Sequence, residues 1–154
     1  MRYLSLLIFA IILSCNGQKK AAMKDNSGMN EGGEKLTLLL QDNYSGTDVA
    51  ETLVIRDIKA LKRFYSKINR TRKPGLPVPE VDFTKEMILI HCIGEQTNGK
   101  QATLFVEEEN DSEVIISASI EKSKKSVTSS ALISPFSVYK MPLTQKEITF
   151  KKEH

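Results

Sequence analysis

The sequence predicts an α+β domain: a mainly antiparallel β-sheet, folded as a sandwich or an open barrel, with one amphipathic helix. Three observations support this class. Several runs after residue 34 alternate apolar and polar residues, which is the pattern of half-buried strands. One stretch, residues 58–69, repeats apolar residues at helical spacing. The later runs are separated by short turn sequences, so we expect an antiparallel meander.

Two short strands are expected first. In residues 35–41, alternation is expected to place three leucines on one face of a strand: Leu36, Leu38 and Leu40. The sequence NYSGTD that follows predicts a turn. Residues 51–57, ETLVIRD, predict the second strand.

The helix is expected directly after this strand. Asp57 precedes it, and its carboxylate can accept hydrogen bonds from the free N–H groups of the first turn. Pro74 and Gly75 are expected to end the helical region. The buried stripe is expected to consist of Ile58, Leu61, Phe64 or Tyr65, and Ile68.

The middle of the chain predicts a connection and a central strand. Residues 74–83 are too rich in proline for a central strand, so we expect an extended surface connection that Phe83 pins at its end. Residues 86–95 are apolar on both faces, which is typical of a covered, central strand. The dipeptide Asn98-Gly99 tolerates positive φ and predicts a tight hairpin into the next strand.

Four further segments complete the predicted sheet. Residues 100–109 and 113–121 alternate, with a turn between them. The stretch 131–142 contains Pro135, which cannot donate to a strand ladder, so we expect an edge strand or a bulge there. Residues 147–152 predict a short terminal strand. The inward-facing residues of the alternating pair are expected to be Ala102, Leu104, Val106, Val114, Ile116, Ala118 and Ile120.

The first residues have the pattern of an export signal. Arg2 precedes an apolar run over residues 4–13, about half of the ~20 residues that a membrane-spanning helix needs. The run ends in Ile-Leu-Ser before Cys15, which resembles the bacterial lipoprotein signal. This resemblance implies cleavage before Cys15 and acyl chains on its sulfur and on the new amino terminus. The alternative is a plain secretory peptide that happens to contain a cysteine.

These features divide the chain into three parts. Residues 1–14 are expected to be a lipoprotein signal peptide, and residues 15–34 a lipidated cysteine followed by a polar, flexible tether. Residues 35–154 are expected to form one α+β domain. We therefore expect a protein of the cell envelope that is held at a membrane through lipid on Cys15. Asn16, and not an aspartate, follows the cysteine. By analogy with known sorting rules, this favours the outer membrane, with the domain facing the periplasm.

Composition argues against several classes of function. The net charge of +3 is too small for a dedicated nucleic-acid binder, so no nucleic-acid partner is expected. Lipid on Cys15 would leave Cys92 as the one free cysteine, and the histidines, His91 and His154, are far apart. Zinc-type spacing and the common nucleotide, hydrolase and metalloprotease motifs are absent, so neither a metal nor a cofactor is expected.

Two clusters are candidates for chemistry. His91 and Cys92 could be a base and a nucleophile, but adjacent residues on a strand point to opposite faces, so we expect a buried cysteine and a half-buried histidine. Glu107 and Glu109 share a strand end and could bind a cation such as calcium, or they could be a solvated strand end. No catalytic residue is assigned, and we do not expect an enzyme.

Three stretches lie in order between about residues 78 and 150: PEVDFTKEMILI, GEQTNGKQATLFVEE and SPFSVYKMP. Together they resemble the C-terminal domain of the protease complex subunit PrcB and its relatives. Gly94, Thr97 and Gly99 fit the glycine-containing hairpin of that family. Asn98 stands where a glycine is usual, and Lys100 where an aromatic residue is usual. The resemblance implies a non-catalytic accessory role, in which the domain stabilises or associates with a partner protein such as a protease.

Two surfaces are candidates for binding that partner. Basic residues crowd the predicted helix and its exit: Lys59, Lys62, Arg63, Lys67, Arg70, Arg72 and Lys73. They form either a patch for an acidic partner or lipid head groups, or the solvated face of an amphipathic helix. Phe136 and Tyr139 follow Pro135 on the expected edge strand, where they either meet a partner strand or close the core.

The sequence therefore predicts a membrane-anchored, non-enzymatic accessory or binding protein of the bacterial envelope. The alternative is an envelope hydrolase or protease inhibitor whose site is assembled from residues that the sequence does not connect.

Overall fold

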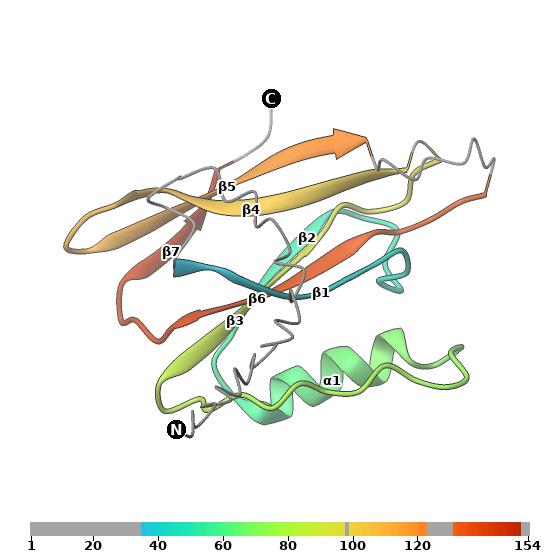
Figure 1. Cartoon of the computed structure of the whole chain (residues 1–154), viewed down its shortest axis with the longest axis horizontal. Coiled ribbons are helices and arrows are strands. Elements are labelled where there is room, and N and C mark those ends of the chain that lie inside the picture. The colour runs from blue at the N-terminus through green and yellow to red at the C-terminus, as the bar shows by residue number, and fades with distance from the viewer. Residues whose placement is uncertain (1–34, 98, 123–130, 152–154) are drawn as a thin grey trace, which may run out of the picture.

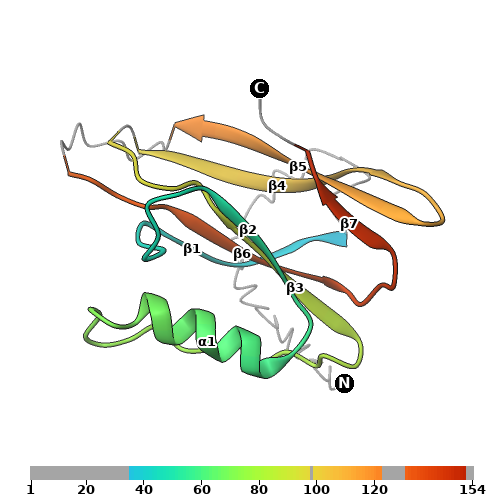
Figure 2. The same cartoon turned by 180° about the vertical axis from the view of Figure 1, so that it is seen from behind.

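The computed structural model describes residues 35–97, 99–122 and 131–151, and these residues form three layers. Figure 1 shows a helix on one side of a four-stranded sheet and a three-stranded sheet on the other side. Figure 2 shows the same order of layers from behind. Neither sheet closes on itself, so the predicted α+β class is confirmed and its β part is a sandwich.

The strands lie close to the predicted runs. The four-stranded sheet has the order β1-β6-β3-β2, and its strands are β1 (Thr37–Asp42), β6 (Phe136–Pro142), β3 (Glu86–Cys92) and β2 (Glu51–Ile55). The three-stranded sheet has the order β4-β5-β7, and its strands are β4 (Lys100–Glu109), β5 (Glu113–Lys122) and β7 (Glu147–Phe150). All neighbours are antiparallel except β5 and β7, which are parallel.

The helix α1 (Ile58–Ile68) packs on the four-stranded sheet and begins as predicted. The Asp57 carboxylate accepts a hydrogen bond from the Ala60 backbone N–H at 2.8 Å. The predicted buried stripe is confirmed except at Ile58, which is 41% exposed. Helical side chains lean toward the N-terminus, so the side chain of the first residue projects past the packed turns.

β3 supplies both hydrophobic cores, as expected for a covered central strand. Ile88, Ile90 and Cys92 pack in the helix core, against α1. Met87 and Leu89 pack in the sandwich core, between the two sheets. The proline-rich connection lies along the helix core, with Phe83 partly buried against it as predicted.

The prediction that three leucines of the first strand share one face is wrong. The pairing of β1 with β6 shifts register between Leu38 and Leu40. Leu36 packs in the sandwich core, Leu40 packs against the helix core, and Leu38 is exposed. A bulge adds one residue to a strand and so reverses the alternation beyond it.

The predicted hairpin between β3 and β4 is also wrong, because these strands belong to different sheets. Gly99 has the expected positive φ of 64°, and Asn98 lies outside the described residues. Gly94 has a φ of 87°, and a Cβ there would lie 2.9 Å from the Ala50 backbone nitrogen. The chain therefore leaves the four-stranded sheet after β3, and Gly94 packs closely against the backbone that leads into β2.

The stretch around Pro135, expected to be an edge strand or a bulge, leads instead into a central strand. β6 lies between β1 and β3, and it begins one residue after Pro135. The carbonyl of Pro135 accepts a hydrogen bond from the Ile93 N–H at 3.0 Å. Because Pro135 precedes the first residue of β6, its lack of an N–H removes no hydrogen bond from the strand pairing. It therefore does not confine β6 to an edge of the sheet.

Candidate functional site

The predicted lipidation site, Cys15, lies outside the described residues, as do the signal and tether over 1–34. In the part of the chain that the structure describes, no helix is long and apolar enough to cross a membrane.

His91 and Cys92 face opposite sides of β3, as predicted. Cys92 is buried in the helix core, and burial raises its pKa to about 12, so the thiol stays protonated near neutral pH. His91 faces the other sheet, with its Nδ1 atom 3.4 Å from Thr52 Oγ1, and burial lowers its pKa. The two side chains cannot act together as base and nucleophile, because the strand separates them.

Lysines occupy the acidic cluster at the end of β4. Glu107 pairs with Lys151 at 2.5 Å, and Glu109 pairs with Lys146 at 2.6 Å. Hydrogen bonds from these lysines hold the pKa of each carboxyl below its usual range. Among the described residues, no group of three or more His, Cys, Asp or Glu side chains could hold a metal ion. The interpretation as a solvated strand end accounts for the cluster.

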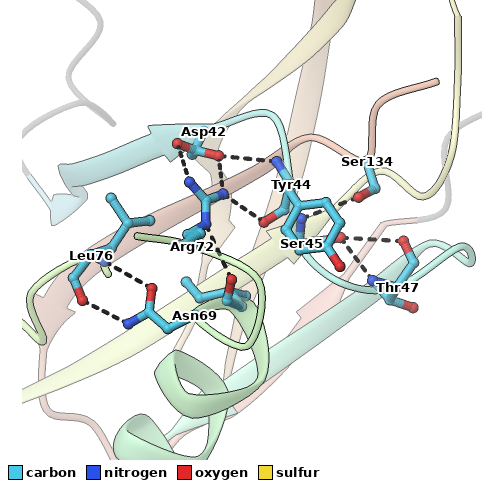
Figure 3. Close-up of polar contacts among 9 residues, drawn as sticks. Asp42, Tyr44, Ser45, Thr47, Asn69, Arg72, Leu76 and Ser134 are labelled. Atoms are coloured by element: carbon cyan, nitrogen blue, oxygen red, sulfur yellow. Dashed lines mark hydrogen bonds and ion pairs between the residues drawn. The ribbon is translucent and has the colours of Figure 1, made fainter. Parts of the chain in front are cut away.

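One member of the predicted basic patch has a structural role, which Figure 3 shows. The Arg72 guanidinium pairs with the Asp42 carboxylate at the end of β1 and donates to the Tyr44 carbonyl at 3.0 Å. Its Nε–H donates to the Ile68 carbonyl at 3.1 Å, and the group also lies over the Tyr44 ring. Arg72 therefore ties the end of α1 to the end of β1.

The other basic side chains remain at the surface. Lys67 pairs with Glu51 of β2 at 3.2 Å, with both side chains partly exposed. Exposed Lys62, Arg63 and Arg70 form no ion pair with another described residue. Four of the predicted binding residues are therefore placed where a partner could reach them: Lys62, Arg63, Lys67 and Arg70.

The predicted docking role of Phe136 and Tyr139 conflicts with their burial, because only 2% and 3% of these residues are exposed. Phe136 packs edge-on against Phe64 of α1, with ring centroids 5.5 Å apart. The Tyr139 hydroxyl accepts a hydrogen bond from the Leu104 N–H on β4 at 3.2 Å. The alternative interpretation, that these aromatic residues close the core, is confirmed.

Among the edge strands of the two sheets, β2 is the one that lies beside exposed Arg63 and Lys67. This strand pairs with β3 on one side and with no described strand on the other. A groove of about 350 Å³ runs between β2 and α1, and we call it the helix groove. Leu53, Ala60 and Phe64 belong to its apolar lining, and its charged lining residues are Glu51, Arg63 and Lys67.

A second hollow lies on the opposite face of the same strand. This inter-sheet cleft has a volume of about 520 Å³, within the usual range of ligand pockets. Thr52 and His91 line it from the four-stranded sheet. The facing wall has an apolar part formed by Leu104, Ile116, Ala118 and Phe150, and two charged residues, Glu51 and Lys151, also line the cleft.

Sequence reasoning found part of this site. The basic residues of α1 were predicted from their clustering, whereas the open edge was assigned to the wrong strand. The cleft was missed because its residues come from β2, β3, β4, β5 and β7, which only the tertiary fold brings together. The one local signal was the position of two polar residues, Thr52 and His91, next to apolar residues of their strands.

Comparisons of this chain with protein-family models, with curated proteins and with solved structures found no match.

Proposed function

We propose that this chain is a lipid-anchored, non-enzymatic accessory protein of the bacterial cell envelope, and that its folded domain binds a partner protein. The open edge of β2 carries this proposal, because an unpaired strand edge beside exposed cationic side chains is suited to bind another chain. The separation of His91 from Cys92 agrees with a role other than nucleophilic catalysis.

The location rests on the resemblance of the first residues to a lipoprotein signal. Two or more acyl chains on Cys15 would hold the domain stably at a membrane. The resemblance of residues 78–150 to the protease complex subunit PrcB also supports an accessory role at a partner protein.

Labelling and crosslinking in cells test this proposal. Cells that express the whole chain are fed an alkyne-tagged fatty acid, and a photocrosslinking amino acid replaces exposed Val54 on β2 or, as the control, exposed Glu80. We expect label in the membrane fraction that Cys15→Ser removes, and one crosslinked protein obtained from position 54 and not from position 80. An unlabelled chain in the aqueous fraction would contradict the anchor. The same crosslinking pattern from both positions would contradict specific binding.

A further inference from the structure

The outer edge of β2 lacks three features that often protect an exposed strand: proline, lysine and a bulge. Its sequence, ETLVI, has neither proline nor lysine, and its pairing with β3 runs through five consecutive partners without a bulge. Val54, near the middle of the strand, is 37% exposed. The N–H and C=O groups along this side are therefore suited to pair with another strand.

β2 also lies between the two hollows. Leu53 lines the helix groove, and its neighbour Thr52 lines the inter-sheet cleft. Side chains of a strand paired with β2 would alternate between the same two faces. Successive side chains of an added strand would therefore meet the helix groove and the inter-sheet cleft in turn.

The helix groove favours acidic side chains. Lys59, Arg63 and Lys67 are spaced four residues apart, so they form one row along α1. Residues 58–73 contain no Asp or Glu, and the carboxylate that lines the groove from β2, Glu51, pairs with Lys67. Arg63 also lines the groove and forms no ion pair with another described residue. A carboxylate that enters over the apolar floor would meet an uncompensated guanidinium, which binds carboxylates in a two-pronged geometry.

The inter-sheet cleft favours large apolar side chains. The apolar part of its far wall consists of Leu104, Ile116, Ala118 and Phe150. Two charged residues also line the cleft, and each already has an ion-pair partner: Glu51 pairs with Lys67, and Lys151 pairs with Glu107. Burial lowers the pKa of His91, so this side chain in the cleft is uncharged near neutral pH. The volume of about 520 Å³ has room for side chains of the size of leucine or phenylalanine.

We infer that β2 binds an extended segment of a partner protein by main-chain pairing. In that segment, acidic side chains facing α1 alternate with large apolar side chains that enter the inter-sheet cleft. This inference rests on the proposed function of partner binding and names the chemistry of the partner.

A labelled peptide tests the inference directly. The probe is a fluorescein-labelled hexapeptide of alternating glutamate and leucine, and its anisotropy is measured with the whole chain purified from membranes in detergent. One control peptide replaces glutamate with lysine. A second control is N-methylated at alternate residues, so it keeps the side chains but loses the main-chain donors on one edge. We expect saturable binding of the first peptide and at least about tenfold weaker binding of both controls.

Two matched variants locate the binding. Arg63→Glu and Lys62→Glu change the net charge equally on neighbouring residues of α1, but only Arg63 lines the helix groove. We expect Arg63→Glu to lower the affinity for the glutamate–leucine peptide at least about tenfold, and Lys62→Glu to lower it less than about threefold. Ala118→Phe, which fills the inter-sheet cleft, should also lower the affinity for this peptide. Circular dichroism checks that each variant folds.

Three results would overturn the inference. They are the absence of binding at about 1 mM peptide, equal binding of the N-methylated peptide, and equal losses in Arg63→Glu and Lys62→Glu. Equal binding of the lysine peptide would indicate adsorption to detergent or lipid and would overturn it too. If position 54 crosslinks to one protein in cells with the same yield before and after the Arg63→Glu substitution, the proposed function stands and this inference fails.

Discussion

The two edges of the four-stranded sheet are built differently. β1 contains a bulge between Leu38 and Leu40, and its end is tied to the exit of α1 by the pair of Asp42 with Arg72. β2 has a regular register, and its charged contact is the partly exposed pair of Glu51 with Lys67. One edge is therefore distorted and fixed by side chains, whereas the other keeps its backbone groups in regular order.

This difference between the two edges shows which basic residues are available to bind a partner. Arg72 and Arg63 both belong to the basic cluster that the sequence shows. Arg72 is bonded to groups at the ends of β1 and α1, whereas Arg63 lines the open helix groove beside β2. A cluster of charges in a sequence does not distinguish these roles. The contacts that each side chain makes in the folded structure distinguish them.

The largest expected effect concerns the strand first predicted to be an edge. Phe136→Ala should lower the free energy of unfolding by about 3–5 kcal/mol, because it removes a buried ring that packs against Phe64. Leu132→Ala, at a residue that is 60% exposed just before β6, is the control and should change it by less than about 0.5 kcal/mol. Chemical denaturation measures both. Equal effects would mean that Phe136 lies at a surface.

The next effect separates the two arginines. Arg72→Ala should lower the free energy of unfolding by about 2 kcal/mol, because Asp42 and the Ile68 carbonyl lose charged hydrogen bonds. Arg63→Ala should change it by less than about 0.5 kcal/mol, because this side chain is exposed. Denaturation curves of both variants make the comparison, and a larger loss from Arg63→Ala would reverse the assignment of roles.

The smallest effect concerns the histidine in the inter-sheet cleft. Burial places the pKa of folded His91 below the ordinary 6.5, so the unfolded chain takes up a proton more readily. The stabilisation from keeping His91 neutral is complete above pH 6.5 and is lost as the pH falls through the lower pKa of the folded state.

His91→Gln should therefore show a shallower loss of stability between pH 6.5 and more acidic conditions than the unchanged chain. Thermal melting at a series of pH values measures this slope. Identical slopes for the two proteins would mean that His91 has the same pKa in the folded and unfolded states.

Local patterns predicted most elements of the fold. Alternation predicted the strands 100–109 and 113–121, and helical spacing with the Asp57 cap predicted α1. The errors came where long-range pairing decides the outcome. Asn98-Gly99 favours a turn, but the strands on either side of it pair with partners elsewhere, and Pro135 lies just outside the strand it was expected to limit.

The candidate site divides in the same way. The helix groove joins β2 and α1, which are consecutive in the sequence, so the basic residues of α1 could be predicted from their spacing alone. The inter-sheet cleft depends on how two sheets stack, and its wall residues, such as Leu104 and Phe150, look like ordinary core residues in the sequence. Only the fold shows that they leave a hollow beside an open strand.

Hydrogen–deuterium exchange, followed by mass spectrometry, tests the comparison of the two edges most directly. The whole chain is measured with and without the glutamate–leucine peptide, and exchange is compared between residues 51–55 of β2 and residues 37–42 of β1. Main-chain pairing at the open edge predicts slower exchange in β2 and unchanged exchange in β1. Slower exchange in β1 alone, or no change in β2 at a saturating concentration of peptide, would contradict the account.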